Sequence, residues 1–173
     1  MGDDVTVLER LFYPRGVAVI GSASEGKMGY ELLRQMLVGS DEAGIGGAGR
    51  PRVRVPDDVG SEPTAHGMPA YRAFVVNPKG EGALGIAGYS AVVQIEAPVD
   101  LAVIASPPST VPAVLGDCGQ AGVAAAAIIT AGFSEVGNEQ AERTVVEAAR
   151  RSGVRFVGPN CAGIVNTGHH LYP

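Results

Sequence analysis

The chain has 173 residues, a length that fits one domain of ordinary size. Hydrophobic residues make up 46% of it and charged residues 18%, which is too apolar and too weakly charged for a disordered chain. The formal net charge of −5 at pH 7 argues against nonspecific binding of nucleic acid, because such binding needs a basic face.

The first predicted unit is a buried strand, a glycine-rich turn and a helix. Residues 17–20 read Val-Ala-Val-Ile, a continuous apolar run typical of a strand buried on both faces of a parallel sheet. Gly and Ser are frequent in residues 21–29. Apolar residues then recur at helical spacing over residues 32–37, and Gly39 can end the helix.

Residues 39–72 do not continue this pattern. They hold many Gly, Pro, Asp and Arg residues without a clear period, where such units usually need about 2–6 connecting residues. We expect an inserted surface loop, and the alternative is a lid or a partner contact. A short apolar strand follows at residues 73–76.

The strand and helix pattern then recurs to the end of the chain. Further strands are expected at residues 100–105, 123–130 and 154–157. Ser109 can cap one intervening helix and Asn138 the other, while Gly122 and Gly153 can end them. Five strands that alternate with helices predict a single α/β domain with a Rossmann-like, doubly wound parallel sheet.

The unusual residues gather where the predicted strands end. These segments are residues 21–29, 77–80, 106–108, 131–137 and 158–161. Ligands of open parallel sheets bind at this edge, so we expect the site there. The first segment leads into a helix N-terminus, which favours a phosphate, but its glycines do not form a GxGxxG motif. A turn that needs small residues for close packing is the alternative.

The segment after the second strand indicates what kind of nucleotide binds. An NAD-binding unit places Asp or Glu there to hold the ribose hydroxyls. This chain has Asn77, Pro78 and Lys79 instead. A cation attracts phosphate, which predicts a phosphorylated ribose and therefore NADP or coenzyme A (CoA). The alternative is a solvated loop lysine.

Five segments carry motifs that occur in register, residues 11–21, 76–80, 99–104, 131–137 and 158–164. Taken together, they resemble the CoA-binding domain of nucleoside-diphosphate-forming acyl-CoA synthetases. This family includes ADP-forming acetyl-CoA synthetase and the succinyl-CoA synthetase alpha subunit, and the same domain begins some protein acetyltransferases. The resemblance runs in order from about residue 8 to residue 168, with residues 39–72 as an interruption.

The resemblance implies roles for residues at the carboxyl edge. The segment 21–24, with Lys27 nearby, would line the CoA pyrophosphate and adenosine, and Lys79 would face the 3′-phosphate. Asn160 and Cys161 lie in the loop that would approach the thiol end. The CoA-binding residues implied are Gly21, Ser22, Ala23, Ser24, Lys27, Val76, Asn77, Pro78, Lys79, Ala105, Ser106, Pro107 and Asn160.

No catalytic or metal-binding residue is assigned. The family's phosphorylated histidine lies in the domain after the CoA-binding one, and His169 and His170 do not match its position, so we expect them to be solvated. No histidine motif supports Cys161 as a nucleophile, and Cys118 lies on an apolar helix face typical of the core. Glu135 could orient a reacting group, although a loop or capping role is favoured.

Residues 1–173 are therefore expected to form a CoA-binding domain without the ligase and phosphohistidine domain that follows it in the family. The first hypothesis is a domain or subunit of an acyl-CoA synthetase, inactive alone and working with ligase and ATP-grasp domains or subunits. The second is a noncatalytic CoA-sensing module, for example of a protein acetyltransferase, and the third is an NAD(P)-binding redox domain.

The sequence also indicates a compartment. The two cysteines lack CxxC spacing, which favours a reducing cytoplasm. No apolar run reaches the ~18 residues of a membrane span, and the N-terminus lacks the basic start of a signal peptide. We therefore expect a cytoplasmic protein with no membrane partner.

Overall fold

The computed structural model describes residues 3–38, 71–166, 169, 171 and 173. The strands are β1 (Gly16–Gly21), β2 (Arg72–Val76), β3 (Gly88–Tyr89), β4 (Leu101–Ala105), β5 (Ala125–Ile128) and β6 (Arg155–Val157). The helices are α1 (Asp3–Phe12), α2 (Met28–Val38), α3 (Val111–Gln120) and α4 (Glu139–Ser152). Short 3-10 turns lie at η2 (Val92–Gln94), η3 (Pro108–Thr110) and η4 (Ser134–Val136).

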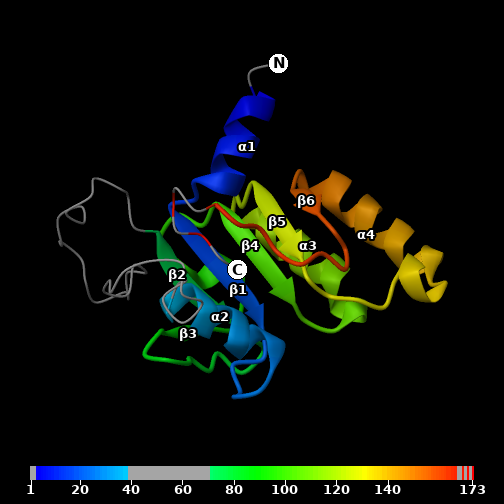
Figure 1. The fold of residues 1–173 in the computed structure, drawn as a ribbon. Helices are drawn as coiled ribbons and strands as arrows, with labels where there is room; N and C mark the ends of the chain where they lie inside the picture. The colour runs from blue at the N-terminus through cyan, green and yellow to red at the C-terminus, as the bar shows by residue number, and fades with distance from the viewer. Residues whose placement is uncertain (1–2, 39–70, 167–168, 170, 172) are drawn as a thin grey trace.

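The strands form one parallel sheet in the order β3-β2-β1-β4-β5-β6 (Figure 1). The central strand β1 pairs with β2 on one side and β4 on the other, so Ile20 lies level with both Val76 and Ile104. The chain order reverses between β1 and β4, which is the switch point of a doubly wound sheet. The Rossmann-like α/β fold predicted from the sequence is confirmed.

Alternate residues of each strand supply two hydrophobic clusters, one on each face of the sheet. Ala18 and Ile20 of β1 pack on the face covered by α3 and α4. Val17 and Val19 pack on the other face, against α2 and residues of α1 and the C-terminal segment. Because both faces are covered, the central strands must be apolar throughout, and their continuous apolar runs follow from this.

The helix ends agree with most of the predicted caps. The side chain of Asn138 accepts a hydrogen bond from the Ala141 N–H at the start of α4, and Gly153 takes the left-handed conformation at its end. Ser109 is not the cap of α3, because it lies inside the preceding turn η3 and the cap position falls on Thr110. Pro107 is the residue before this turn and Pro108 is its first residue, and the fixed φ angle of proline favours the turn.

Three further elements differ from the prediction. Helix α1 and strand β3 were not expected, and β5 is shorter than residues 123–130. Tyr71 is 1% exposed and Arg72 begins β2, so both belong to the fold and not to the predicted inserted loop. The rest of that loop, with Gly39, lies outside the described residues.

In the described part of the chain, no helix has the length and apolar character that crossing a membrane requires.

Candidate functional site

A cavity of about 500 Å³ lies at the carboxyl edge of the sheet, next to the switch point. It is formed by the ends of β1 and β2, the loop after β4, the turn η2 and one side of α3. Its volume is within the range of roughly 300–1,000 Å³ that is usual for ligand pockets. The residues that line it are Ile20, Gly21, Ser22, Ala23, Ser24, Val76, Asn77, Pro78, Lys79, Glu81, Ser90, Ala91, Val92, Ser106, Pro107, Thr110, Val114 and Asp117.

The loop after β1 approaches its neighbours too closely for larger residues. A Cβ atom at Gly21 would lie 2.9 Å from the carbonyl oxygen of Ala105, across the switch point. A Cβ atom at Gly29, in the first turn of α2, would lie 2.7 Å from the carbonyl oxygen of Ser22. Because these two residues have no side chain, the loop after β1 can pack closely against Ala105 and against the start of α2. This supports the packing role considered from the sequence.

Asn77 fixes the loop after β2. Its side chain is 7% exposed and is fully engaged with the backbone. The side-chain amide donates to the carbonyl oxygen of Glu81 at 2.7 Å, and the side-chain oxygen accepts from the N–H groups of Lys79 and Glu81 at 3.2 Å each. Asn77 therefore shapes this wall of the cavity, and Lys79 and Glu81 carry its charges.

Lys79 and Glu81 form an ion pair on the wall of the cavity. The Nζ atom of Lys79 lies 3.6 Å from the Oε1 atom of Glu81, and the two side chains are 77% and 56% exposed. Such an exposed pair contributes at most about 1 kcal/mol, so the lysine can exchange this partner for another anion at little cost. Glu81 lines the cavity beside Lys79, and nothing in the sequence pattern singles it out.

The opposite wall is held by hydroxyl groups. The hydroxyl of Thr130 donates to the carbonyl oxygen of Ser106 at 2.8 Å, which anchors the loop after β4 to the end of β5. The hydroxyl of Thr110 donates to the carbonyl oxygen of Pro107 at 2.7 Å and lies 2.9 Å from the Ser106 hydroxyl oxygen. Thr110 thus closes the turn that leads into α3, whose residues Val114 and Asp117 continue the same wall.

All but three of the CoA-binding residues expected from the sequence line this cavity. The exceptions are Lys27, which is exposed just before α2, Ala105, which packs on the other face of the sheet, and Asn160. The N–H of Asn160 donates to the carbonyl oxygen of Thr130 at 3.0 Å, so its loop lies beside β5 and away from the end of β2.

The sequence reasoning also missed part of the lining. Val114 and Asp117 lie on a helix face, and Ser90, Ala91 and Val92 follow the short strand β3. Neither segment has the Gly, Pro and Asn content that marks the other loops. In the sequence, only the position of Asp117 beside the apolar face of this helix could have indicated that α3 contributes to the site.

Glu135 and Cys161 lie in the loops after β5 and β6. The Glu135 carboxylate accepts hydrogen bonds from the N–H groups of Gly132 and Phe133, and the bond from Gly132 is the main cause that lowers the pKa of this carboxyl. The loop-capping role favoured from the sequence is confirmed. The Sγ atom of Cys161 lies 3.4 Å from the carbonyl oxygen of Ile128, to which the thiol can donate.

Two other residues singled out in the sequence lie away from the cavity. Cys118 is fully buried in the core, as predicted, and burial is the first cause that raises its pKa to about 12. His169 is not solvated, contrary to the expectation. It is 4% exposed, packs between the rings of Tyr13 and Tyr71, and its Nε2 atom lies 3.2 Å from the carbonyl oxygen of Pro14. These partners precede β1 and β2, at the opposite edge of the sheet from the cavity; His170 lies outside the described residues.

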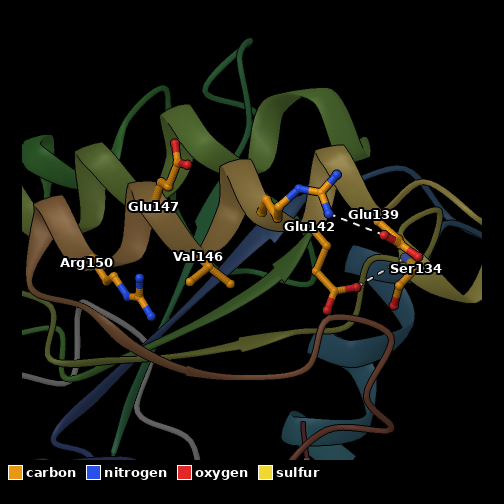
Figure 2. A pocket seen from close by; sticks show the side chains of 7 residues that line it. Ser134, Glu139, Glu142, Val146, Glu147 and Arg150 are labelled. Atoms are coloured by element: carbon orange, nitrogen blue, oxygen red, sulfur yellow. Dashed lines mark hydrogen bonds and ion pairs between the residues drawn. The ribbon is translucent and has the colours of Figure 1, made fainter.

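A second hollow of about 490 Å³ runs along the outer side of α4 (Figure 2). Two of its carboxylates already have partners: Glu142 accepts from the Ser134 N–H at 3.1 Å, and Glu139 pairs with Arg143 at 3.3 Å. It lies on a helix surface and not at the strand ends. Among the described residues, no cluster of three or more His, Cys, Asp or Glu residues is placed to hold a metal ion. The cavity at the switch point is therefore the candidate functional site.

The fold and the position of the cavity define a nucleotide-binding domain of the Rossmann-like class. Residues 54–167 match the family described as CoA binding domain. Because this match covers more than half of the chain, the protein belongs to the CoA-binding domain family.

Several of the similar proteins are acetate–CoA ligases (ADP-forming). The chain is 38% identical over 161 residues to an acetate–CoA ligase (ADP-forming) of Methanocaldococcus jannaschii, covering 92% of this chain and 19% of the ligase. It is also 38% identical to the alpha subunit of acetate–CoA ligase (ADP-forming) I of Pyrococcus furiosus, covering 92% of this chain and 30% of that subunit.

A solved structure agrees with these relatives. The apo form of a dinucleotide forming acetyl-coenzyme A synthetase 1 from Ca. Korarchaeum cryptofilum superposes with a TM-score of 0.68 at 34% identity. The similarity covers 88% of this chain and 28% of that one. The chain thus spans between about a fifth and a third of the length of these relatives.

Proposed function

We propose that this chain binds CoA in the cavity at the switch point, as the CoA-binding domain or subunit of an ADP-forming acyl-CoA synthetase. The observation that carries the proposal is the position of Lys79. It lies on the wall of the cavity directly after β2, where an NAD-binding domain has an acidic residue for the ribose hydroxyls. A cation at this position suits the 3′-phosphate that distinguishes CoA from dephospho-CoA.

The rest of the cavity fits the nucleotide end of CoA. The small residues after β1 line the cavity and lead toward the N-terminus of α2, whose dipole favours a pyrophosphate. Val76, Val92 and Val114 give the cavity apolar surface that suits an adenine ring. The residues that bind CoA in this proposal are those of the cavity, led by the loop after β1 and by Lys79.

The complete enzyme of this proposal converts an acid, CoA and ATP to acyl-CoA, ADP and phosphate. The similarity to acetate–CoA ligases supports this activity over a sensing module or a redox domain. Since the chain spans only part of those relatives, ligase and ATP-grasp domains or subunits would supply the phosphoryl transfer, and this chain alone would bind CoA without turnover. The two free cysteines suit the cytoplasmic location expected from the sequence.

Calorimetric titration with CoA, dephospho-CoA, NADH and NADPH tests the proposal. We expect CoA to bind most tightly. The Lys79→Ala variant should lose about tenfold in affinity for CoA, a modest loss because Lys79 is largely exposed to solvent. Its affinity for dephospho-CoA should change little, because that ligand lacks the 3′-phosphate. Lys27→Ala is the matched control, because it removes an exposed lysine outside the cavity and should leave the preference for CoA over dephospho-CoA unchanged. Equal binding of CoA and dephospho-CoA by the unmodified protein would refute the phosphate assignment.

A further inference from the structure

The part of the cavity between η2 and α3 differs in chemistry from the loop that carries Lys79. Thr110, Val114 and Asp117 follow one another along a single face of α3 and the turn before it, at the spacing of neighbouring helical turns. Across from them, Val92 is buried in the same hydrophobic cluster as the core residues of α3. This part of the cavity is therefore lined by the apolar side chains of Val92 and Val114, by the hydroxyl groups of Ser90 and Thr110, and by one carboxylate.

The carboxylate of Asp117 is available to a ligand. Asp117 is half-buried, and its backbone carbonyl accepts the N–H of Ala121 within the helix. No described residue engages its side chain through a hydrogen bond or an ion pair. By contrast, the hydroxyl of Ser90 on the facing segment already donates to the side chain of Gln94 at 3.0 Å.

The charge of Asp117 decides which part of a nucleotide can lie beside it. A carboxylate repels phosphate and accepts hydrogen bonds only, so it needs a donor. Apolar walls around it suit a flat heteroaromatic ring. The adenine of CoA is such a ring, and its exocyclic amine is a donor at the ring edge.

We propose that Asp117 is a specificity-determining residue, whose carboxylate accepts a hydrogen bond from the exocyclic amine of the adenine of CoA. This inference rests on the proposed function and adds to it the residue that recognises the base. Recognition of the nucleotide is then divided between two side chains: Lys79 binds the 3′-phosphate and Asp117 binds the amine.

Two small probes isolate the amine. Adenosine 3′,5′-bisphosphate carries it, and purine riboside 3′,5′-bisphosphate has hydrogen in its place. We expect the unmodified protein to bind the first about tenfold more tightly, which is the usual effect of one hydrogen bond to a charged group. In Asp117→Ala, the two probes should bind within about twofold of each other, and Asp117→Asn, which keeps an acceptor oxygen, should retain part of the preference.

Glu147→Gln is the control, because it neutralises an exposed carboxylate on α4, away from the cavity, and should keep the full preference. An Asp117→Ala variant that loses affinity for both probes but keeps the preference would overturn the inference, since it would show a structural role. If that variant does not fold, as judged by circular dichroism, the Asn variant replaces it: its preference for the amine should be smaller than that of the unmodified protein, and a full preference would overturn the inference.

The two proposals fail in different ways. Absence of CoA binding by the unmodified protein would overturn the proposed function and this inference with it. Binding of CoA in preference to dephospho-CoA, without any preference for the amine, would overturn the assignment of Asp117 alone.

Discussion

The Nζ atom of Lys79 lies 3.6 Å from the Oε1 atom of Glu81, so the cation that we propose for the 3′-phosphate already has a counter-ion. Glu81 also lines the cavity. An incoming phosphate must therefore compete with this carboxylate, and it must approach an additional negative charge. The negative charge of Glu81 therefore opposes the binding of a phosphate at Lys79, and a substitution of Glu81 alone can remove this effect.

Glu81→Gln should raise the affinity for CoA. The gain is expected to be about 1.4- to fivefold, because exposed ion pairs are worth about 0.2–1 kcal/mol, and it should shrink as salt is added. Calorimetry with CoA and dephospho-CoA measures it, and the gain should be larger for CoA. Glu96→Gln, which neutralises an exposed carboxylate outside the cavity, should change neither affinity. A loss of CoA affinity in Glu81→Gln would mean that Glu81 positions Lys79.

Asn77→Ala should destabilise the protein and weaken CoA binding together. The substitution leaves three backbone groups of Lys79 and Glu81 without their partner, which costs about 1–3 kcal/mol. Urea denaturation measures the change in the free energy of unfolding. Asn77→Asp keeps the oxygen that accepts both N–H groups but sets a carboxylate oxygen against the carbonyl oxygen of Glu81, so it should also destabilise the protein. A fully stable alanine variant would show that the loop is held by other contacts.

The predictability of these features from sequence follows from their physical causes. The central strands are predictable, because a strand covered on both faces must be apolar throughout. Strand β3 is not predictable, since it has only two residues, Gly88 and Tyr89, and pairs at the edge of the sheet. Helix α1 is amphipathic but follows no recognisable turn or strand, and it was not anticipated.

The site divides in the same way. The loops after β1, β2 and β4 are predictable, because Gly, Pro and Asn concentrate where the backbone turns sharply. Asp117 and Val114 belong to a regular helix, and their face toward the cavity depends on how α3 packs on the sheet. His169 was expected in solvent, because residues near a chain end usually are. In the structure its ring lies against the carbonyl oxygen of Pro14 and is buried.

The ionisation of Asp100 should make the free energy of unfolding depend on pH in the acid range. Burial alone would raise the pKa of this carboxyl, but hydrogen bonds from the side chain and backbone of Arg15, with the charges of Arg15 and Arg10, hold it below its usual value. The side-chain bonds are 2.8 Å each. Because the pKa of Asp100 is lower in the folded protein than in the unfolded protein, its ionisation stabilises the fold. This stabilisation is fully present above the unfolded-state pKa of about 3.9 and is lost as the pH falls through the folded-state pKa.

Urea denaturation from pH 7 to pH 2 measures this contribution. Asp100→Asn should lose about 1–3 kcal/mol at pH 7, because it weakens charge-assisted bonds to an exposed arginine, and its stability should fall less between pH 4 and pH 2. Glu147→Gln, which removes an exposed pair with Arg151, should cost less than about 0.5 kcal/mol. Parallel acid profiles for Asp100→Asn and the unmodified protein would contradict the role of Asp100.

The two cysteines should differ in reactivity. The thiolate is the reactive form, and the pKa of Cys118 is raised to about 12, first by burial and then by the charge of Asp117. Cys161 is only half-buried, in the loop after β6. An aromatic disulfide reagent at pH 8 should therefore modify one thiol per folded chain and two in urea, and Cys161→Ser should abolish the reaction of the folded protein. Rapid modification of Cys118 in the native state would show that the core beneath α3 opens more readily than its packing implies.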